Sequence, residues 1–442
     1  MDYDVVIVGA SISGLLTAHY LLKKDLKVLL IDLKSSKRLG ESVSGNIIHD
    51  ETVVFIKEAF GIRIPKIVIE HDISTVHIRQ FEGKDIEINS KNYVVNKNYL
   101  LAYLLGKALN HENFEFLERH IVMGLVEEDK QFTAIRVQNM NSGAKLVIKA
   151  KVFVDASGPT AVLRKSIPEN RFVNNEIEDF DRAVVYEEVL QLEKEFNSTV
   201  IAFDPSKIKG GHLWIIPKKD NLVSFGVGIP GMPTDIKKIF NDYKRRIPEF
   251  ANSELKSSST GIVPHRRPLN SFIFKNVVII GGAGCQVNPL ITCYMDYGIR
   301  GAFYAAKNIA ISVKKEIINT ETLWDYNSEY MKDIGGESAI FESIRDFFTS
   351  LSSEEFNFIL EKKIVPPSLI EKLEKGIRKR DIFFNSAGLL LKPGLIHKFV
   401  RLVNYSNSMK KLYNEYPDYG GFLQWKNKLQ NQIIKVRQSF LV

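Results

Sequence analysis

The start of the chain combines an apolar run, a turn of small residues and a downstream acid, and this combination restricts the folds that the chain can adopt. Residues 4–8 read Asp-Val-Val-Ile-Val, and Gly9, Ser11 and Gly14 follow them. Asp32 stands eighteen residues after Gly14, at the end of a second apolar run. The pattern predicts a strand, a glycine turn, a helix and a second strand, the unit that binds the ADP part of a dinucleotide.

The small residues of this turn each have a physical task. Gly9 permits the tight turn, the small Ser11 lets the backbone approach a pyrophosphate, and Gly14 lets the helix pack against the strand. The helix N-terminus then faces the phosphate charge, and we assign Ser13 to the same site. Asp32 would accept hydrogen bonds from the ribose hydroxyls. Because Ser11 replaces the usual second glycine, an ordinary buried strand followed by a helix stays open as the alternative.

The composition is that of a globular protein. Apolar residues make up 45% of the 442 positions and charged residues 25%, and a chain of this length is expected to form two or three domains. No run approaches the roughly 18 apolar residues of a membrane-spanning helix, and the first strand begins too early to leave room for a secretory signal. We expect a cytoplasmic protein that is soluble or bound peripherally at the inner face of a membrane.

The charge balance restricts the partners only weakly. Lysine and arginine number 60 against 52 aspartates and glutamates, a net charge of +8. This surplus suits an anionic partner such as an acidic lipid headgroup or a phosphorylated substrate, but scattered lysines are also typical of a solvated surface. No nucleic-acid-binding module is recognisable, and the cysteines lack zinc spacing. We therefore expect neither a nucleic acid partner nor a metal site.

The remaining sequence predicts a mixed α/β and α+β architecture with a second sheet and a helical end. A Rossmann-like domain is expected from residues 1–65, 93–175 and 261–330, which contain further apolar strands that end in small-residue turns. Residues 66–92 and 176–260 alternate in short β-rich runs and predict a substrate-side sheet. Residues 331–442 predict a C-terminal helical region.

The turns and one further motif resemble a known family. Three glycine turns in this order resemble the FAD-dependent oxidoreductases of the aromatic-hydroxylase fold. Trp214 and Pro217, followed after eight residues by Gly226 and then Gly228, resemble the geranylgeranyl reductase motif Tyr-x-Trp-x-Phe-Pro, seven or eight residues, Gly-x-Gly. His212 replaces the tyrosine of this motif, and Ile216 replaces the phenylalanine.

The resemblance implies an FAD site and an isoprenoid-binding cavity beside the flavin. The cavity would be lined by His212, Trp214, Ile216, Pro217, Gly226 and Gly228. Besides the first turn, the cofactor would be held by Ser44, Gly45, Lys97, Val122, Asp155, Gly158, Gly281, Gly282, Pro289 and Gly298.

Four of these positions depart from the family pattern. Gly282 stands where an acid usually follows the first glycine of the third turn, and Ser44 stands where a cysteine is common near the flavin ring. Lys97 replaces an arginine and loses its bidentate geometry. Gly298 comes nine residues after Pro289, farther than the family's glycines.

The activity that the resemblance implies is hydride transfer from reduced FAD to an isolated double bond of a geranylgeranyl chain. The substrate would be an isoprenoid ether lipid or a prenyl diphosphate, and NAD(P)H, ferredoxin or another external donor would supply electrons. His212 is titratable and could donate the proton, although packing or hydrogen bonding is an alternative role. His265, Arg266 and Arg267 could meet a phosphate headgroup or form a solvated basic turn.

Two other functions stay open. Trp214, Ile216 and Pro217 also fit the Trp-x-Trp-x-Ile-Pro motif of flavin-dependent halogenases, so a halogenase or a flavin-dependent monooxygenase is the first alternative. A non-catalytic isoprenoid-lipid carrier, which keeps the cavity without binding FAD, is the second.

Overall fold

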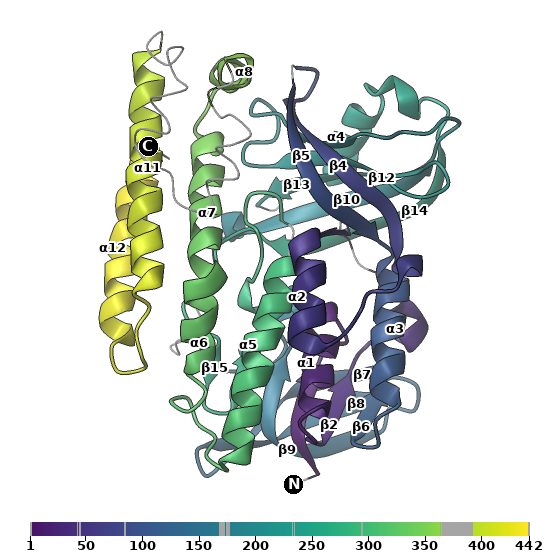
Figure 1. Cartoon of the computed structure of the whole chain (residues 1–442), viewed down its shortest axis with the longest axis vertical. Coiled ribbons are helices and arrows are strands. Elements are labelled where there is room, and N and C mark those ends of the chain that lie inside the picture. The colour runs from purple at the N-terminus through teal and green to yellow at the C-terminus, as the bar shows by residue number, and fades with distance from the viewer. Residues whose placement is uncertain are drawn as a thin grey trace.

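The computed structural model describes residues 2–41, 43, 46–83, 85–167, 173, 177–231, 233, 235–292, 295–362, 364 and 392–440. Two sheets lie in this part of the chain, each with eight strands. Figure 1 shows the first sheet at the bottom, the second at the upper right, and the C-terminal helices along the left side. This arrangement confirms the predicted mixed fold with a C-terminal helical region.

The first sheet is built on a parallel centre in which β1 lies between β2 and β9. The apolar run that ends β1, from Val5 to Val8, is buried, as expected for a parallel strand covered on both faces. The strands are β1 (Tyr3–Val8), β2 (Val28–Ile31), β6 (Phe114–Leu117), β7 (His120–Glu128), β8 (Gln131–Asn139), β9 (Lys145–Asp155), β15 (Ile273–Phe274) and β16 (Val277–Ile279).

The second sheet has the strand order β14-β10-β13-β12-β11-β4-β5-β3 and is antiparallel except where β11 pairs with β4. Its strands are β3 (Ile47–His49), β4 (Ile69–Gln80), β5 (Asp85–Val95), β10 (Arg182–Gln191), β11 (Thr199–Phe203), β12 (His212–Pro217), β13 (Leu222–Pro230) and β14 (Glu254–Pro264). The helix α4 (Ile236–Lys244) covers one face through Phe240, which packs with Leu213, Ile215 and Phe225 in a separate apolar cluster.

Helices cover the first sheet and continue into the C-terminal region. They are α1 (Ile12–Leu22), α2 (Asp50–Phe60), α3 (Lys97–Leu109), α5 (Met295–Lys314), α6 (Asp325–Tyr330), α7 (Gly336–Thr349), α8 (Ser353–Glu361), α11 (Pro393–Asn414) and α12 (Phe422–Phe440). The helix α1 packs against α3 and α5, and α7 packs against α11. None of the helices that the structure describes is both long and apolar enough to cross a bilayer.

Candidate active site

Three glycine turns meet at the carboxyl ends of the parallel strands. A Cβ on Gly9 would lie 2.3 Å from the carbonyl oxygen of Ala156, and a Cβ on Gly14 would lie 2.1 Å from that of Gly9. A Cβ on Gly282 would lie 3.2 Å from the Cα of Gly158. The sequence therefore needs glycine at 9, where the first and second turns touch through their backbones, and at 14, where the helix packs on the carbonyl of Gly9 within the first turn.

The first turn has the features that an ADP group requires. Ser11 caps α1 by accepting a hydrogen bond from the Gly14 amide at 3.3 Å, so the helix N-terminus lies at this turn. The two Asp32 carboxylate oxygens accept hydrogen bonds from the amides of Ala10 and Lys34, each at 2.7 Å. Each oxygen keeps a lone pair for a ribose hydroxyl. These residues fit the ADP part of FAD.

The third turn is braced by a glutamine that our sequence reasoning missed. The Gly281 amide donates to Gln286 Oε1 at 2.6 Å, and Gln286 Nε2 donates to the Tyr326 hydroxyl at 2.8 Å. That hydroxyl donates to the carbonyl of Ile279 at 2.8 Å. A Cβ on Gly301 would lie 2.0 Å from Gln286 Oε1, which explains the small residue there. This chain of hydrogen bonds fixes the backbone of a turn that has Gly282 instead of an acid.

Of the other predicted cofactor residues, some lie beside the glycine turns and others lie on different elements. Gly298 packs on the first turn, because a Cβ there would lie 2.6 Å from Ser13 Oγ. Pro289 is buried beside the third turn, and Val122 is buried in β7. Lys97 begins α3, and burial lowers its pKa to about 8. Ser44 and Gly45 lie outside the described residues.

The structure does not support a direct cofactor contact for Asp155. Its side chain is fully buried at the end of β9. One carboxylate oxygen accepts hydrogen bonds from the Ser157 amide and hydroxyl, at 3.1 and 2.6 Å. The other accepts from the Arg164 amide at 2.8 Å. Asp155 therefore holds the second turn in shape.

A cavity of about 900 Å³ lies against one face of the second sheet. His212, Trp214 and Ile216 alternate along β12, so their side chains share this face, and all three line the cavity. The register places Trp214 opposite Ile201 and Ile201 opposite Ile78, which also line it. The sheet therefore provides an apolar wall on which the predicted motif lies.

The two motif glycines make room for the motif's large side chains. The register pairs Trp214 with Gly226 and His212 with Gly228. A Cβ on Gly226 would lie 2.0 Å from Trp214 Cζ2, whereas a Cβ on Gly228 would lie 3.4 Å from His212 Cε1. The glycines thus support the wall instead of reaching the lumen. Pro217 has the opposite parity in β12, so the structure does not support its predicted contact with substrate.

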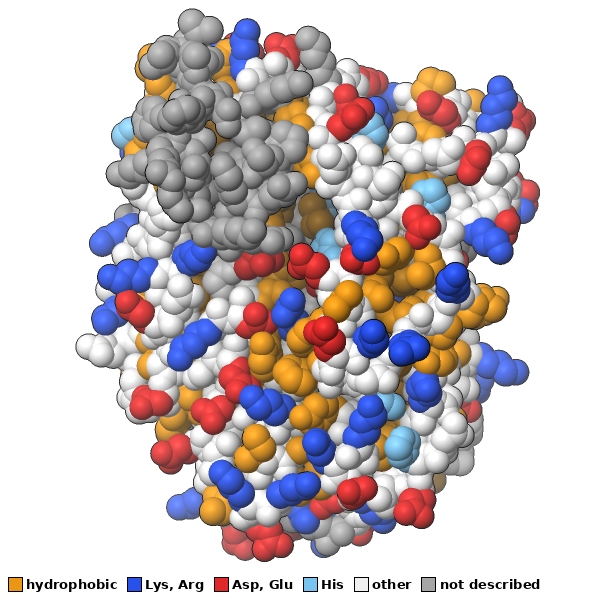
Figure 2. All heavy atoms as spheres, in the orientation of Figure 1, with side chains coloured by type: hydrophobic (Ala, Val, Ile, Leu, Met, Phe, Trp, Pro, Cys, Tyr) orange, Lys and Arg blue, Asp and Glu red, His pale blue; other side chains and the backbone are white. Residues whose placement is uncertain are grey.

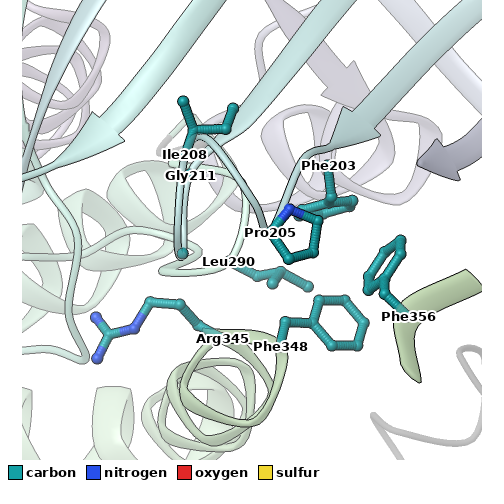
Figure 3. Close-up of a pocket in the computed structure, with 9 residues that line it drawn as sticks. Phe203, Pro205, Ile208, Gly211, Leu290, Arg345, Phe348 and Phe356 are labelled. Atoms are coloured by element: carbon teal, nitrogen blue, oxygen red, sulfur yellow. The ribbon is translucent and has the colours of Figure 1, made fainter. Parts of the chain in front are cut away.

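The opposite wall comes from the C-terminal helices, which the sequence did not identify as part of the site. Its apolar side chains include Phe347 of α7, Ile359 of α8 and Leu402 of α11. Figure 3 shows Phe203 of β11 with Phe348 and Phe356 where the two walls meet. The ring centroid of Phe203 lies 5.5 Å from that of Phe348 and 5.7 Å from that of Phe356.

Polar side chains line the cavity where it meets the surface. We call Asp50, Glu51, Lys91, Arg300, Asp333 and Glu337 the rim. Figure 2 shows an opening on this face with apolar side chains inside it and charged side chains beside it. The Lys91 side chain is 76% exposed, whereas Phe347 inside the cavity is 1% exposed. The cavity is thus charged at its mouth and apolar inside, which suits an amphiphilic ligand.

Two titratable groups share the sheet face that forms the cavity wall. Burial lowers the pKa of His212 to about 4, so its imidazole is neutral at pH 7. Glu187 of β10 pairs with Gly226, in the same row as Trp214. Burial raises its pKa to about 7, against the opposing effects of Ser224 and Lys97. Its Oε2 makes no hydrogen bond within the described structure. Sequence reasoning missed Glu187, although an acid flanked on its own strand face by Val185 and Val189 was a visible signal.

Both roles considered for the segment His265–Arg267 are wrong, because its side chains are buried. The three residues are 1%, 3% and 6% exposed. Arg266 pairs with Asp181 at 3.0 Å and Arg267 with Glu342 of α7 at 2.9 Å. The segment therefore joins the C-terminal helices to the rest of the protein and offers no cation to a headgroup.

Comparisons with known proteins agree with this geometry. The model of the FAD dependent oxidoreductase family matches residues 4–183. Digeranylgeranylglycerophospholipid reductase of Sulfolobus acidocaldarius is 25% identical to this chain over 99% of both proteins. A geranylgeranyl bacteriochlorophyll reductase-like structure from Thermoplasma acidophilum has a TM-score of 0.76 at 14% identity and covers 91% of this chain and 99% of its own.

A flavin-dependent brominase shares the fold, with a TM-score of 0.64 at 19% identity over 98% of this chain and 99% of its own. The comparisons together confirm the resemblance to the geranylgeranyl reductases, the fold class and FAD as the cofactor.

Proposed function

We propose that this FAD-dependent oxidoreductase, a relative of the geranylgeranyl reductases, reduces isolated double bonds in the geranylgeranyl chains of isoprenoid lipids or their precursors. The observation that carries the proposal is the cavity of about 900 Å³ with one wall formed by the Trp214 strand and the other by apolar helices. Leu290 and Ile291, which follow the third glycine turn, also line this cavity. The lipid chain and the cofactor site are therefore neighbours.

Reduced FAD supplies the hydride for such a reaction when it is bound. The chain's own residues hold the alkene and exclude water. Trp214 is 5% exposed and Ile216 2%, so a prenyl chain against them is removed from solvent at a gain of about 0.8 kcal/mol per CH₂. Gly9, Ser11 and Asp32 would hold the ADP end, and Lys97 would supply a cation to the cofactor.

The reaction also needs a proton, and the two buried titratable groups differ in their ability to hold one. Because His212 has a pKa of about 4, it carries no spare proton at pH 7, and we assign it a packing and hydrogen-bonding role. Glu187 has a pKa of about 7 and is partly protonated at that pH. It lies in the row of Trp214, which makes it a better proton reserve than His212.

The test is anaerobic incubation of the chemically reduced holoprotein with geranylgeranyl lipids, followed by mass spectrometry. We expect products that have gained two hydrogens for each reduced double bond. Unchanged masses with flavin bound would rule out the reductase, whereas a protein that binds the lipid without binding flavin would favour the lipid carrier. Oxygen consumption coupled to hydroxylated or halogenated products would favour the monooxygenase or halogenase instead.

A lipid substrate calls for a contact with membranes, and one surface suits it. Ile67 is 76% exposed and Tyr99 is 56% exposed. They belong to η2 (Lys66–Val68) and to the first turn of α3, which contact each other. Arg63 and Lys66 beside them are exposed. We propose that this apolar and basic surface touches the inner face of the cytoplasmic membrane.

We also propose that a separate donor such as NAD(P)H or ferredoxin delivers the electrons that reduce the flavin.

A further inference from the structure

The cavity runs along α7 from its charged mouth to an aromatic end. Glu337 of the rim lies in the first turn of α7, and Phe348 lies in the last turn. Phe341 and Ile344 lie between them and also line the cavity. Residues at this spacing share one face of a helix, and the stretch from Glu337 to Phe348 spans about 17 Å at 1.5 Å per residue. A lipid with its headgroup at the rim would therefore extend its chain toward Phe348.

Three phenylalanine rings from three different elements close this end of the cavity. Phe203 ends β11, Phe348 belongs to α7, and Phe356 belongs to α8. The ring centroid of Phe348 lies 5.3 Å from that of Phe356, and Phe203 lies at similar distances from both. These separations are typical of packed aromatic pairs, so each ring contacts the other two. We call Phe203, Phe348 and Phe356 the aromatic barrier.

A second, much smaller pocket lies beside the aromatic barrier. Its volume is about 10 Å³, which leaves room for about one water molecule. The three rings of the barrier, together with Leu290, line both this pocket and the large cavity. Figure 3 shows the rings on one side of the small pocket and Ile208 and Gly211 on the other. Loss of one ring would therefore join the small pocket to the cavity.

The lining of the small pocket suits a hydrocarbon. Pro205 and Ile208 contribute apolar side chains. Arg345 also lines the pocket, but its guanidinium donates hydrogen bonds to the carbonyl of His265 and to Asp346. Its charge is thus already compensated inside the protein. An isoprene unit that entered this space would meet mainly apolar atoms.

We propose that the aromatic barrier sets the length of the prenyl chain that the cavity accepts, so that a chain of four isoprene units ends at the rings and a chain of five does not fit. The proposal rests on the proposed function, because it concerns the chain of the same isoprenoid lipid. A fifth unit would have to displace packed rings or push the headgroup out of the rim, and overpacking of this kind is unfavourable.

Phe348 is the ring of the barrier that is best suited to a test. Phe203 and Phe356 are 6% and 1% exposed, whereas Phe348 is half-buried. Replacement of Phe348 should therefore disturb the fold least. The ring that Phe348→Ala removes also has about the size of one isoprene unit, so the space that it leaves matches the additional length of the longer chain.

The first experiment compares two saturated glycerophospholipids that cannot be reduced, one with chains of four isoprene units and one with chains of five. The holoprotein is incubated with both in equal amounts in neutral micelles, recovered by gel filtration and analysed for bound lipid by mass spectrometry. We expect about a tenfold excess of the shorter lipid or more, because the micelle buries the fifth unit and the cavity does not, and each unburied CH₂ corresponds to about fourfold in affinity. Equal recovery, an excess of the longer lipid, or recovery of neither would overturn the proposal.

Two variants make the experiment specific to the barrier. Phe348→Ala joins the small pocket to the cavity, so the excess of the shorter lipid should fall about tenfold. Phe303→Ala is the matched control, because Phe303 is also half-buried and packs against Phe55 and Phe60, with ring centroids 5.4 and 5.9 Å away. Phe303 lines neither space, and this variant should keep the ratio of the parent protein. An unchanged ratio in Phe348→Ala, or an equal shift in both variants, would overturn the proposal.

A third variant tests the barrier in the opposite direction and does not depend on the folding of Phe348→Ala. Phe348→Trp enlarges the side chain and shortens the cavity. In a competition between saturated lipids of three and four isoprene units, this variant should favour the shorter lipid about tenfold more than the parent protein does. No gain in that preference would contradict the assigned role of the ring.

Failure of the chain-length proposal is distinguishable from failure of the proposed function. The unsaturated forms of the four-unit and five-unit lipids are offered to the chemically reduced holoprotein in parallel. If both lipids gain hydrogens at equal rates, the reductase stands and the chain-length proposal falls. If the saturated four-unit lipid is bound preferentially but no unsaturated lipid gains hydrogens, the chain-length proposal stands and the reductase falls.

Discussion

At the scale of single residues, the cavity wall depends on the Trp214 indole, which lies over a glycine on the neighbouring strand. A Cβ on Gly226 would lie 2.0 Å from Trp214 Cζ2. Gly226→Ala should therefore displace the indole and cost about 1–3 kcal/mol of unfolding free energy, the usual penalty of overpacking. Denaturant unfolding and the indole fluorescence measure the two effects. Gly228→Ala is the matched control, because its Cβ would meet His212 at 3.4 Å. Equal losses in both variants would contradict the steric explanation.

The second prediction at the residue scale is that Glu187 makes the stability of the protein depend on pH. Burial raises its pKa from 4.5 to about 7, so the folded state keeps a proton that the unfolded state loses. Its contribution to stability is therefore greatest below pH 4.5 and falls as the pH rises to about 7. Each pKa unit corresponds to 1.36 kcal/mol, which gives a loss of up to about 3 kcal/mol.

Glu187→Gln cannot ionise and should lack this loss. Unfolding free energies of the parent protein and the variant, measured at pH 5 and pH 8, should therefore differ in their pH dependence. The parent should lose stability relative to the variant on going to pH 8. A difference between the two proteins that does not change with pH would show that Glu187 titrates normally.

At the scale of elements, a buried ion pair fixes α7 and with it one wall of the cavity. Arg267, which follows β14, lies 2.9 Å from Glu342, and both side chains are at most 7% exposed. Glu342→Gln leaves the guanidinium buried without its counter-charge and should cost about 3–5 kcal/mol. Urea unfolding measures this loss. Asp242→Asn breaks the exposed Arg245–Asp242 pair and should change stability by less than about 1 kcal/mol. Comparable losses in both variants would contradict the assigned role.

The elements also show what the sequence could and could not predict. The cavity role of His212, Trp214 and Ile216 was predictable because the motif resembles that of the reductases and its glycines had the expected spacing. Phe347 and Leu402 were not identified as cavity residues, since helical periodicity defines an apolar face without defining the surface that it meets. Glu187 was missed for a similar reason, because its environment depends on the register between β10 and β13.

At the scale of the whole molecule, the exposed apolar and basic surface predicts how the protein meets a membrane. Replacing both Ile67 and Tyr99 by serine should weaken binding to vesicles that contain phosphatidylserine by about tenfold or more, since each apolar side chain contributes about 1.5–3 kcal/mol when buried. Cosedimentation measures the binding. Leu255→Ser is the control, because Leu255 is 51% exposed on β14, at the far edge of the second sheet. Unchanged binding in the double variant would place the contact elsewhere.

One wall of the cavity comes from helices that follow both sheets in the chain, so the ribosome synthesises this wall last. Until α7, α8 and α11 pack against it, the apolar face of the second sheet is exposed to the surroundings of the nascent chain. A cellular fatty acid or the natural ligand can bind to this face before the helices pack against it. We therefore expect freshly purified protein to contain a co-purified amphiphile. Extraction of the protein with organic solvent, followed by mass spectrometry, would identify it.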